Sequence, residues 1–122
     1  MEELLFQVSD VFGNTVSLTL DRWRYIQKHP ELRGRDEALR AVMRQPTMVS
    51  QSSEMEQRFI FDGYGLLAPT SNIVRVVVQY NTSDIKKGSG AGKVITAYGP
   101  LHAGTGNVGK LIYFSGTARR SL

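Results

Sequence analysis

The hydrophobic pattern of this chain changes its period near Pro46, and this change limits the folds open to the chain. Before Pro46, apolar residues recur at helical spacing over about residues 19–29 and 36–44. After Pro46, they form short β-branched and aromatic runs, which indicate strands. The pattern predicts an α+β fold, with two N-terminal helices packed on one face of a mostly antiparallel sheet of about four strands. The clearest strands are expected at residues 58–61, 73–80, 94–98 and 111–114, with a shorter candidate at 47–50.

Two short apolar runs precede the first predicted helix, at residues 4–8 and 16–19. Gly13-Asn14 lies between them as a turn signal, so the runs are expected to pair as a hairpin or to extend a sheet edge. Thr19 is a suitable N-cap for the helix that follows, and Leu20, Trp23 and Ile26 should form its buried stripe.

Length and composition fit a single domain over residues 1–122. The chain is 41% hydrophobic and 21% charged, as folded domains are, and its lack of cysteine excludes disulfides and thiolate catalysis. No apolar run approaches the roughly 20 residues that a membrane-spanning helix needs. The start of the chain is acidic, unlike a secretory signal, so we expect a cytoplasmic protein with no membrane partner.

The formal net charge is +4, and the basic residues are grouped. A clustered positive excess favours polyanions through phosphate contacts, so RNA is the expected partner. A solvated helix face or loop is the alternative for each group. One group lies in the helical segment and others lie toward the C-terminus: Arg22, Arg24, Lys28, Arg33, Arg35, Arg40 and Arg44; Lys86, Lys87, Lys93 and Lys110; Arg119 and Arg120.

Residues 104–110 have the spacing of a phosphate-binding P-loop, but their context differs. That motif requires a following helix and a Ser or Thr after the lysine. Here Leu111 follows Lys110 and begins an apolar run typical of a strand. We therefore expect a glycine-rich loop between two strands and no nucleotide cofactor. With two histidines and no accompanying group of acidic residues, no metal site is expected either.

His29 is the main candidate for chemistry. On a continuous helix, Arg22, Tyr25 and His29 would fall on adjoining turns of one face, at the boundary between core and solvent. Imidazole exchanges protons near neutral pH, and RNA cleavage without a metal needs a group that does so. Alternatively, His29 caps the C-terminus of the helix and interacts favourably with its dipole.

Strand alternation supplies the remaining candidates. In the valine-rich segment, Arg75 should face away from the helices, either free in solvent or lining an open sheet surface. In the next strand, Val94, Thr96 and Tyr98 should share a face, on which the hydroxyls could hold a phosphate and the ring could stack on a base. Ordinary β-propensity is the alternative for the threonine and the tyrosine. We expect Lys93 to contact RNA together with the helix residues Arg22 and Tyr25.

Two motifs in this order carry a resemblance to a known group of proteins. They are the segment Leu-Asp-Arg-Trp-Arg-Tyr-Ile-Gln-Lys-His-Pro-Glu-Leu, at residues 20–32, and the strand Val-Ile-Thr-Ala-Tyr, at 94–98. Together they resemble the phage and prophage nuclease-like domains of the barnase–EndoU–colicin–RelE (BECR) superfamily. The resemblance covers about residues 19–113 and implies a small, metal-free ribonuclease fold.

The resemblance also implies a function and site residues. Related domains act on RNA, often as toxins or phage-associated effectors, so an antitoxin or immunity protein is an expected partner. The helix histidine and the strand threonine of such domains correspond here to His29 and Thr96. Many relatives carry a second histidine where this chain has Tyr25, and a phenol holds its proton too tightly to replace imidazole as a base at neutral pH. Two hypotheses follow: a metal-independent endoribonuclease, and a catalytically inactive domain of the same fold that binds RNA or a protein partner.

Overall fold

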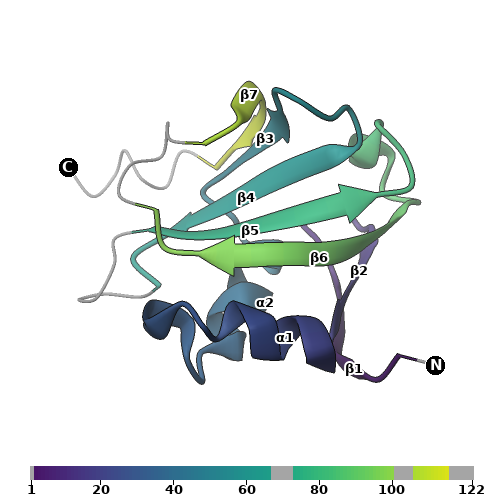
Figure 1. Ribbon diagram of the computed structural model, residues 1–122. Coiled ribbons are helices and arrows are strands. Elements are labelled where there is room, and N and C mark those ends of the chain that lie inside the picture. Colours follow the sequence, from purple (N-terminus) through teal and green to yellow (C-terminus); the bar gives the residue numbers. More distant parts are fainter. Residues whose placement is uncertain (1, 67–72, 101–105, 116–122) are drawn as a thin grey trace.

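The computed structural model describes residues 2–66, 73–100 and 106–115, which form an α+β fold (Figure 1). In the described residues a hairpin comes first, two helices follow, and the remaining strands come after the helices. In chain order the elements are β1 (Leu4–Ser9), β2 (Thr15–Thr19), α1 (Leu20–Ile26), the 3-10 turn η1 (Pro30–Leu32), α2 (Asp36–Arg44), β3 (Met48–Ser52), β4 (Arg58–Tyr64), β5 (Ile73–Tyr80), the 3-10 turn η2 (Ile85–Lys87), β6 (Ala91–Tyr98) and β7 (Val108–Phe114).

The described strands form one sheet of seven, in the order β1-β2-β6-β5-β4-β3-β7. Neighbouring strands are antiparallel except β2 and β6, which run parallel and pair from Thr15 opposite Ala91 to Ser17 opposite Lys93. The prediction of an α+β fold is confirmed, whereas the expected number of about four strands is too low. The N-terminal hairpin accounts for most of the difference, because it joins the same sheet through this parallel pairing.

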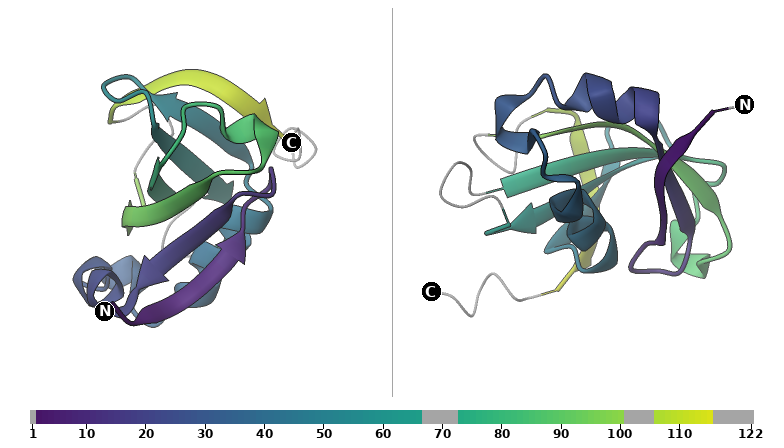
Figure 2. Two further views of the ribbon diagram at one scale, coloured as in Figure 1. Left: turned by 90° about the vertical axis from the view of Figure 1, so that its right-hand side faces the viewer. Right: turned by 90° about the horizontal axis from the view of Figure 1, so that it is seen from below.

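Both helices lie on the same side of the sheet (Figures 1 and 2). Helix α1 begins where predicted, since the Thr19 side chain accepts a hydrogen bond from the backbone N–H of Arg22. It buries Trp23 and Ile26, while α2 has the predicted bounds and buries four apolar side chains. These α2 residues are Ala38, Leu39, Val42 and Met43.

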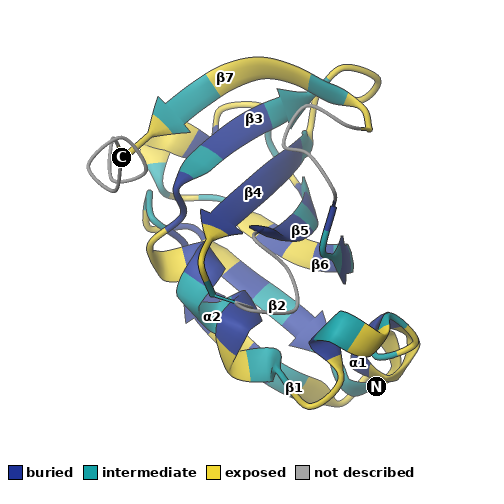
Figure 3. Ribbon diagram, turned by 90° about the vertical axis from the view of Figure 1, so that its left-hand side faces the viewer, coloured by how far each residue is buried: buried dark blue, intermediate teal, exposed yellow. Residues whose placement is uncertain are grey.

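The core lies between the helices and the central strands. Alternate residues of β5, namely Val74, Val76 and Val78, belong to the same buried cluster as the apolar faces of α1 and α2. Helix α2 approaches β4 so closely that a Cβ on Gly63 would lie 2.7 Å from a methyl group of Val42. Strand β4 is accordingly buried over most of its length, whereas the edge strand β7 is largely exposed (Figure 3).

A buried polar network fixes the turn between β1 and β2. The Asp10 carboxylate accepts hydrogen bonds from the backbone N–H groups of Phe12 and Asn14, from the Asn14 side chain and, at 2.7 Å, from the hydroxyl of Tyr80. Asn14 Nδ2 also donates to the carbonyl of Ile85, at 2.7 Å. Burial, together with the hydrogen bond to Asp10 and its charge, raises the pKa of Tyr80 above its ordinary value. The network therefore links the hairpin to β5 and η2.

The glycine-rich segment before Leu111 leads directly into a strand. A strand rather than a helix follows the loop, as predicted, but the loop is shorter than expected, because Val108 and Lys110 already belong to strand β7. Its first residues, 104 and 105, lie outside the described part of the chain, as do His102, Arg119 and Arg120.

Candidate functional site

His29 lies just beyond the end of α1. The helix ends at Ile26, three residues earlier than predicted, and His29 precedes the 3-10 turn that starts at Pro30. The missing N–H of Pro30 and the clash of its ring with the preceding turn explain why the helix does not continue. The prediction that Arg22, Tyr25 and His29 share one continuous helix face is therefore wrong.

The half-buried His29 side chain contacts the end of β6. Its ring lies 5.9 Å from the ring of Tyr98, centroid to centroid, with an angle of 36° between the planes. The turn η1 is held at the same place, because the backbone N–H of Gly99 donates to Oε2 of Glu31 at 2.8 Å. Two candidates that are distant in sequence, His29 and Tyr98, are thus brought together.

A β-bulge determines which residues of β6 share a face. Thr96 pairs with Val77, but the next pair toward the start of β6 joins Val94 to Val78, so the register skips Ile95. Val94 therefore faces the helix-side core, where Ala97 also lies. The prediction that Val94 shares a face with Thr96 and Tyr98 is therefore wrong, because the extra residue Ile95 reverses the alternation. Thr96 and Tyr98 do share a face, which is opposite to that of Val94.

Arg75 lies beside Tyr98 on that opposite face, but it is buried rather than open. Its side chain is 1% exposed and forms a bidentate ion pair with Asp62, with Nε–Oδ1 at 2.8 Å and Nη2–Oδ2 at 2.9 Å. Burial alone would lower the pKa of the Arg75 guanidinium, but hydrogen bonding and charge from Asp62, with a further contribution from Tyr98, raise it above its ordinary value. Arg75 faces away from the helices as predicted, but neither solvent nor an open surface surrounds it.

Asp62, Arg75 and Tyr98 form a row across three adjacent strands. Asp62 pairs with Arg75 across β4 and β5, and Arg75 pairs with Tyr98 across β5 and β6. Gly106 approaches the end of this row, because a Cβ at this position would lie 3.5 Å from both Arg75 Nη1 and the Tyr98 hydroxyl. We define the candidate site as His29, Glu31, Asp62, Arg75, Thr96 and Tyr98.

Two members of this site, Asp62 and Glu31, were not predicted from the sequence. The strand predicted at residues 58–61 stops before Asp62, whereas β4 continues to Tyr64. The available signal was the position of one acidic residue within an otherwise apolar strand, since such a residue needs a partner when buried. Nothing in the sequence indicates that Glu31 accepts a hydrogen bond from Gly99.

The predicted RNA-binding residues separate into two places. Arg22 and Tyr25 lie together on the exposed surface of α1, where the Tyr25 ring has Arg22 Cζ at 5.4 Å and Lys28 Nζ at 5.3 Å from its centroid. Lys93 instead lies near the start of β6, opposite Gln79, and its Nζ is 3.7 Å from a carboxylate oxygen of Glu2. Lys93 is therefore not part of the candidate site.

The site offers an imidazole, a phenol and a threonine hydroxyl beside a paired arginine. Such groups can exchange protons and donate hydrogen bonds to an anionic ligand. Within residues 2–66, 73–100 and 106–115, no three His, Asp or Glu side chains are grouped in a way that could hold a metal ion. None of the helices in the described ranges is both long and apolar enough to cross a membrane.

Comparisons of this chain with known protein families, with curated proteins and with solved structures found no match.

Proposed function

We propose that this protein is a metal-independent endoribonuclease of the BECR type, with His29 and Tyr98 at its reactive centre. The observation that supports this proposal most directly is the contact between the His29 and Tyr98 rings, at 5.9 Å, beside the buried Arg75. An imidazole and a phenol at one place provide a proton acceptor and a hydrogen-bond donor for the same phosphodiester.

The proposed reaction is an internal transesterification. His29 accepts the proton of the ribose 2′-hydroxyl, whose oxygen forms a bond to the adjacent phosphorus while the bond from phosphorus to the 5′-oxygen breaks. The Tyr98 hydroxyl donates a proton to the departing 5′-oxygen, and solvent restores both groups. The products are a 2′,3′-cyclic phosphate and a free 5′-hydroxyl. Thr96, two positions before Tyr98 on the same face, donates a hydrogen bond to the phosphate.

Arg75 acts in this proposal mainly through Tyr98. The Asp62 carboxylate, which accepts two hydrogen bonds from Arg75, offsets most of the guanidinium charge. Arg75 is therefore a weak direct ligand for phosphate. The fixed guanidinium beside the Tyr98 hydroxyl instead orients that hydroxyl toward the departing 5′-oxygen. The exposed Arg22 and Tyr25 on α1 are the proposed contacts for the rest of the RNA strand.

The test is cleavage of a short RNA by purified protein in the presence of a chelator. We expect cleavage to persist with EDTA and to leave a cyclic phosphate end, as detected by mass spectrometry. Losing a positioned acid–base group slows catalysis by roughly 10²–10⁴-fold, so His29→Ala should abolish detectable cleavage. Lys93→Gln is the matched control, because Lys93 is a basic residue remote from the site, and it should cleave a dinucleotide normally.

Two results would refute parts of the proposal. Full activity in a folded His29→Ala variant would exclude His29 as the acid–base group. Activity destroyed by the chelator would exclude the mechanism as a whole.

The second candidate function is RNA binding without cleavage. It is favoured by the exposed group of Arg22, Tyr25 and Lys28, and by the engagement of Arg75 with Asp62. RNA affinity that falls steeply with salt, without cleavage or toxicity on expression, would support this alternative. A lack of RNA affinity at low salt would contradict both functions and leave a protein partner, such as an antitoxin, as the ligand.

A further inference from the structure

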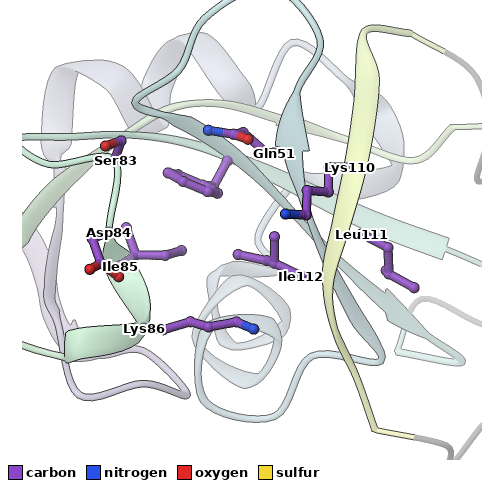
Figure 4. A pocket seen from close by; sticks show the side chains of 9 residues that line it. Gln51, Ser83, Asp84, Ile85, Lys86, Lys110, Leu111 and Ile112 are labelled. Atoms are coloured by element: carbon purple, nitrogen blue, oxygen red, sulfur yellow. The ribbon is translucent and has the colours of Figure 1, made fainter.

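A pocket of about 220 Å³ lies between η2 and β7, away from the candidate site (Figure 4). The His29–Tyr98 contact is at the end of β6, whereas η2 precedes the start of that strand. Eight extended residues separate the two ends of β6, which corresponds to roughly 25 Å. The residues that line the pocket are Gln51, Phe59, Ser83, Asp84, Ile85, Lys86, Lys110, Leu111 and Ile112.

Two lysines approach the pocket from opposite walls. Lys86 comes from η2 and Lys110 from β7, and Figure 4 shows both side chains directed toward the space between these elements. In the described part of the chain neither lysine forms an ion pair. Asp84, the one acidic residue of the lining, has Lys87 Nζ at 3.8 Å from Oδ2. The pocket therefore has an excess of positive charge.

The floor between the lysines is apolar. Phe59 and Ile85 are each 1% exposed, and Ile112 points from β7 toward Ile85, on the same side of the strand as Lys110 (Figure 4). Cations above an apolar floor suit a ligand that has an anionic group and a flat, weakly polar body. This volume is smaller than the roughly 300–1,000 Å³ of pockets that enclose a whole drug-sized ligand. The pocket therefore has room for no more than one nucleotide.

The wall that carries Lys86 is fixed by the buried network under it. Asn14 donates to the carbonyl of Ile85 at 2.7 Å, and Asp10 holds Asn14 in turn. Gly88, which ends η2 with a φ of 75°, packs directly against the carbonyl group of Phe12. The pocket is thus formed before any ligand arrives, which reduces the entropy that binding would cost.

We propose that this pocket binds one nucleotide, with its phosphate between Lys86 and Lys110 and its base over the apolar floor, where the half-buried Ile112 presents the accessible surface above the buried Phe59 and Ile85. The nucleotide could be free in solution or part of an RNA strand, because both present the same phosphate and base. The proposal does not depend on cleavage at His29.

Binding can be followed by NMR through the backbone amides of residues 83–87 and 110–112, with inorganic phosphate, AMP and a hexanucleotide RNA as probes. We expect AMP to shift these amides and to bind more tightly than inorganic phosphate, because only AMP also covers the floor. Tighter binding of the RNA than of AMP would identify a strand as the source, and equal binding would identify the free nucleotide. Equal affinity for AMP and inorganic phosphate would overturn the role of the floor.

The paired variant Lys86→Gln with Lys110→Gln should weaken AMP binding by roughly tenfold, as expected for the loss of two exposed charge contacts. Lys93→Gln is the matched control, because this exposed lysine does not line the pocket and lies near Glu2 rather than Asp84, and the variant should bind AMP normally. Equal weakening by the control, or no amide shift at millimolar AMP, would overturn the proposal. The paired variant should still cleave a dinucleotide if the proposed ribonuclease activity is present, so the two proposals can fail independently.

Discussion

Removing one partner of the buried ion pair between Asp62 and Arg75 should strongly destabilise the protein. Both side chains are 1% exposed, so Asp62→Ala leaves a guanidinium in the interior without the carboxylate that accepts two of its hydrogen bonds. Breaking such a pair costs about 3–5 kcal/mol, which is a large part of the roughly 5–15 kcal/mol of a typical domain. We expect the free energy of unfolding to fall by that amount.

Urea unfolding followed by the fluorescence of Trp23 measures this loss. Trp23 is the single tryptophan and is 6% exposed, so its emission reports whether the core is intact. With a urea dependence of about 2 kcal/mol per molar, a loss of 4 kcal/mol moves the midpoint down by roughly 2 M. The slope itself should stay the same, because the unfolded chain exposes the same surface.

The control is an ion pair of similar length at the surface. Arg24 Nη1 lies 2.9 Å from Asp21 Oδ1, but these side chains are 67% and 86% exposed. Asp21→Ala should therefore change stability little. The paired replacement of Asp62 by Leu and Arg75 by Met should recover most of the loss, since it leaves no unpaired charge in the interior. If Asp62→Ala lowers the free energy of unfolding no more than Asp21→Ala does, burial does not set the contribution of the ion pair to stability.

Two further predictions concern the hairpin and η2. Tyr80→Phe removes a hydrogen bond to the Asp10 carboxylate and should lower the free energy of unfolding by about 1.5–3 kcal/mol at neutral pH. Folding raises the pKa of Tyr80, so the protonated hydroxyl contributes fully to the free energy of unfolding below the unfolded-state pKa near 10. Above that pH the contribution is lost by about 1.4 kcal/mol per pH unit. Urea titrations at pH 9–11 should show a shallower decline for Tyr80→Phe, and an unchanged decline would contradict the assignment. Gly88→Ala should lower the melting temperature more than Gly34→Ala, because both glycines have positive φ but only a Cβ at Gly88 would overlap the carbonyl of Phe12.

The sequence allowed prediction of those elements whose determinants are local. Thr19 begins α1 because its own hydroxyl accepts the Arg22 N–H, and α2 has the expected bounds because its apolar spacing is regular. The alternation of β5 also predicted which of its residues, such as Val76, meet the helices.

The parts of the fold and the site that were missed depend on pairing between distant segments. The extra residue Ile95 in β6 is a property of its register against β5, and no local pattern indicates it. The burial of Arg75 depends on Asp62, which approaches it only because β4 and β5 pair. The parallel pairing that makes the hairpin part of the main sheet is likewise invisible in either strand alone.

That parallel pairing also has a consequence for how the protein forms during synthesis. Asn14 at the turn of the hairpin donates and accepts hydrogen bonds with residues near η2, and its partner Gly90 lies 76 positions further along the chain. At roughly 5–20 residues per second, a ribosome needs about 4–15 s to make the intervening segment. For that time the edge of β2 at Thr15–Ser17 lacks the strand with which it pairs in the finished sheet, so its backbone N–H and C=O groups are open. The nascent hairpin therefore keeps an open strand edge until β6 leaves the exit tunnel.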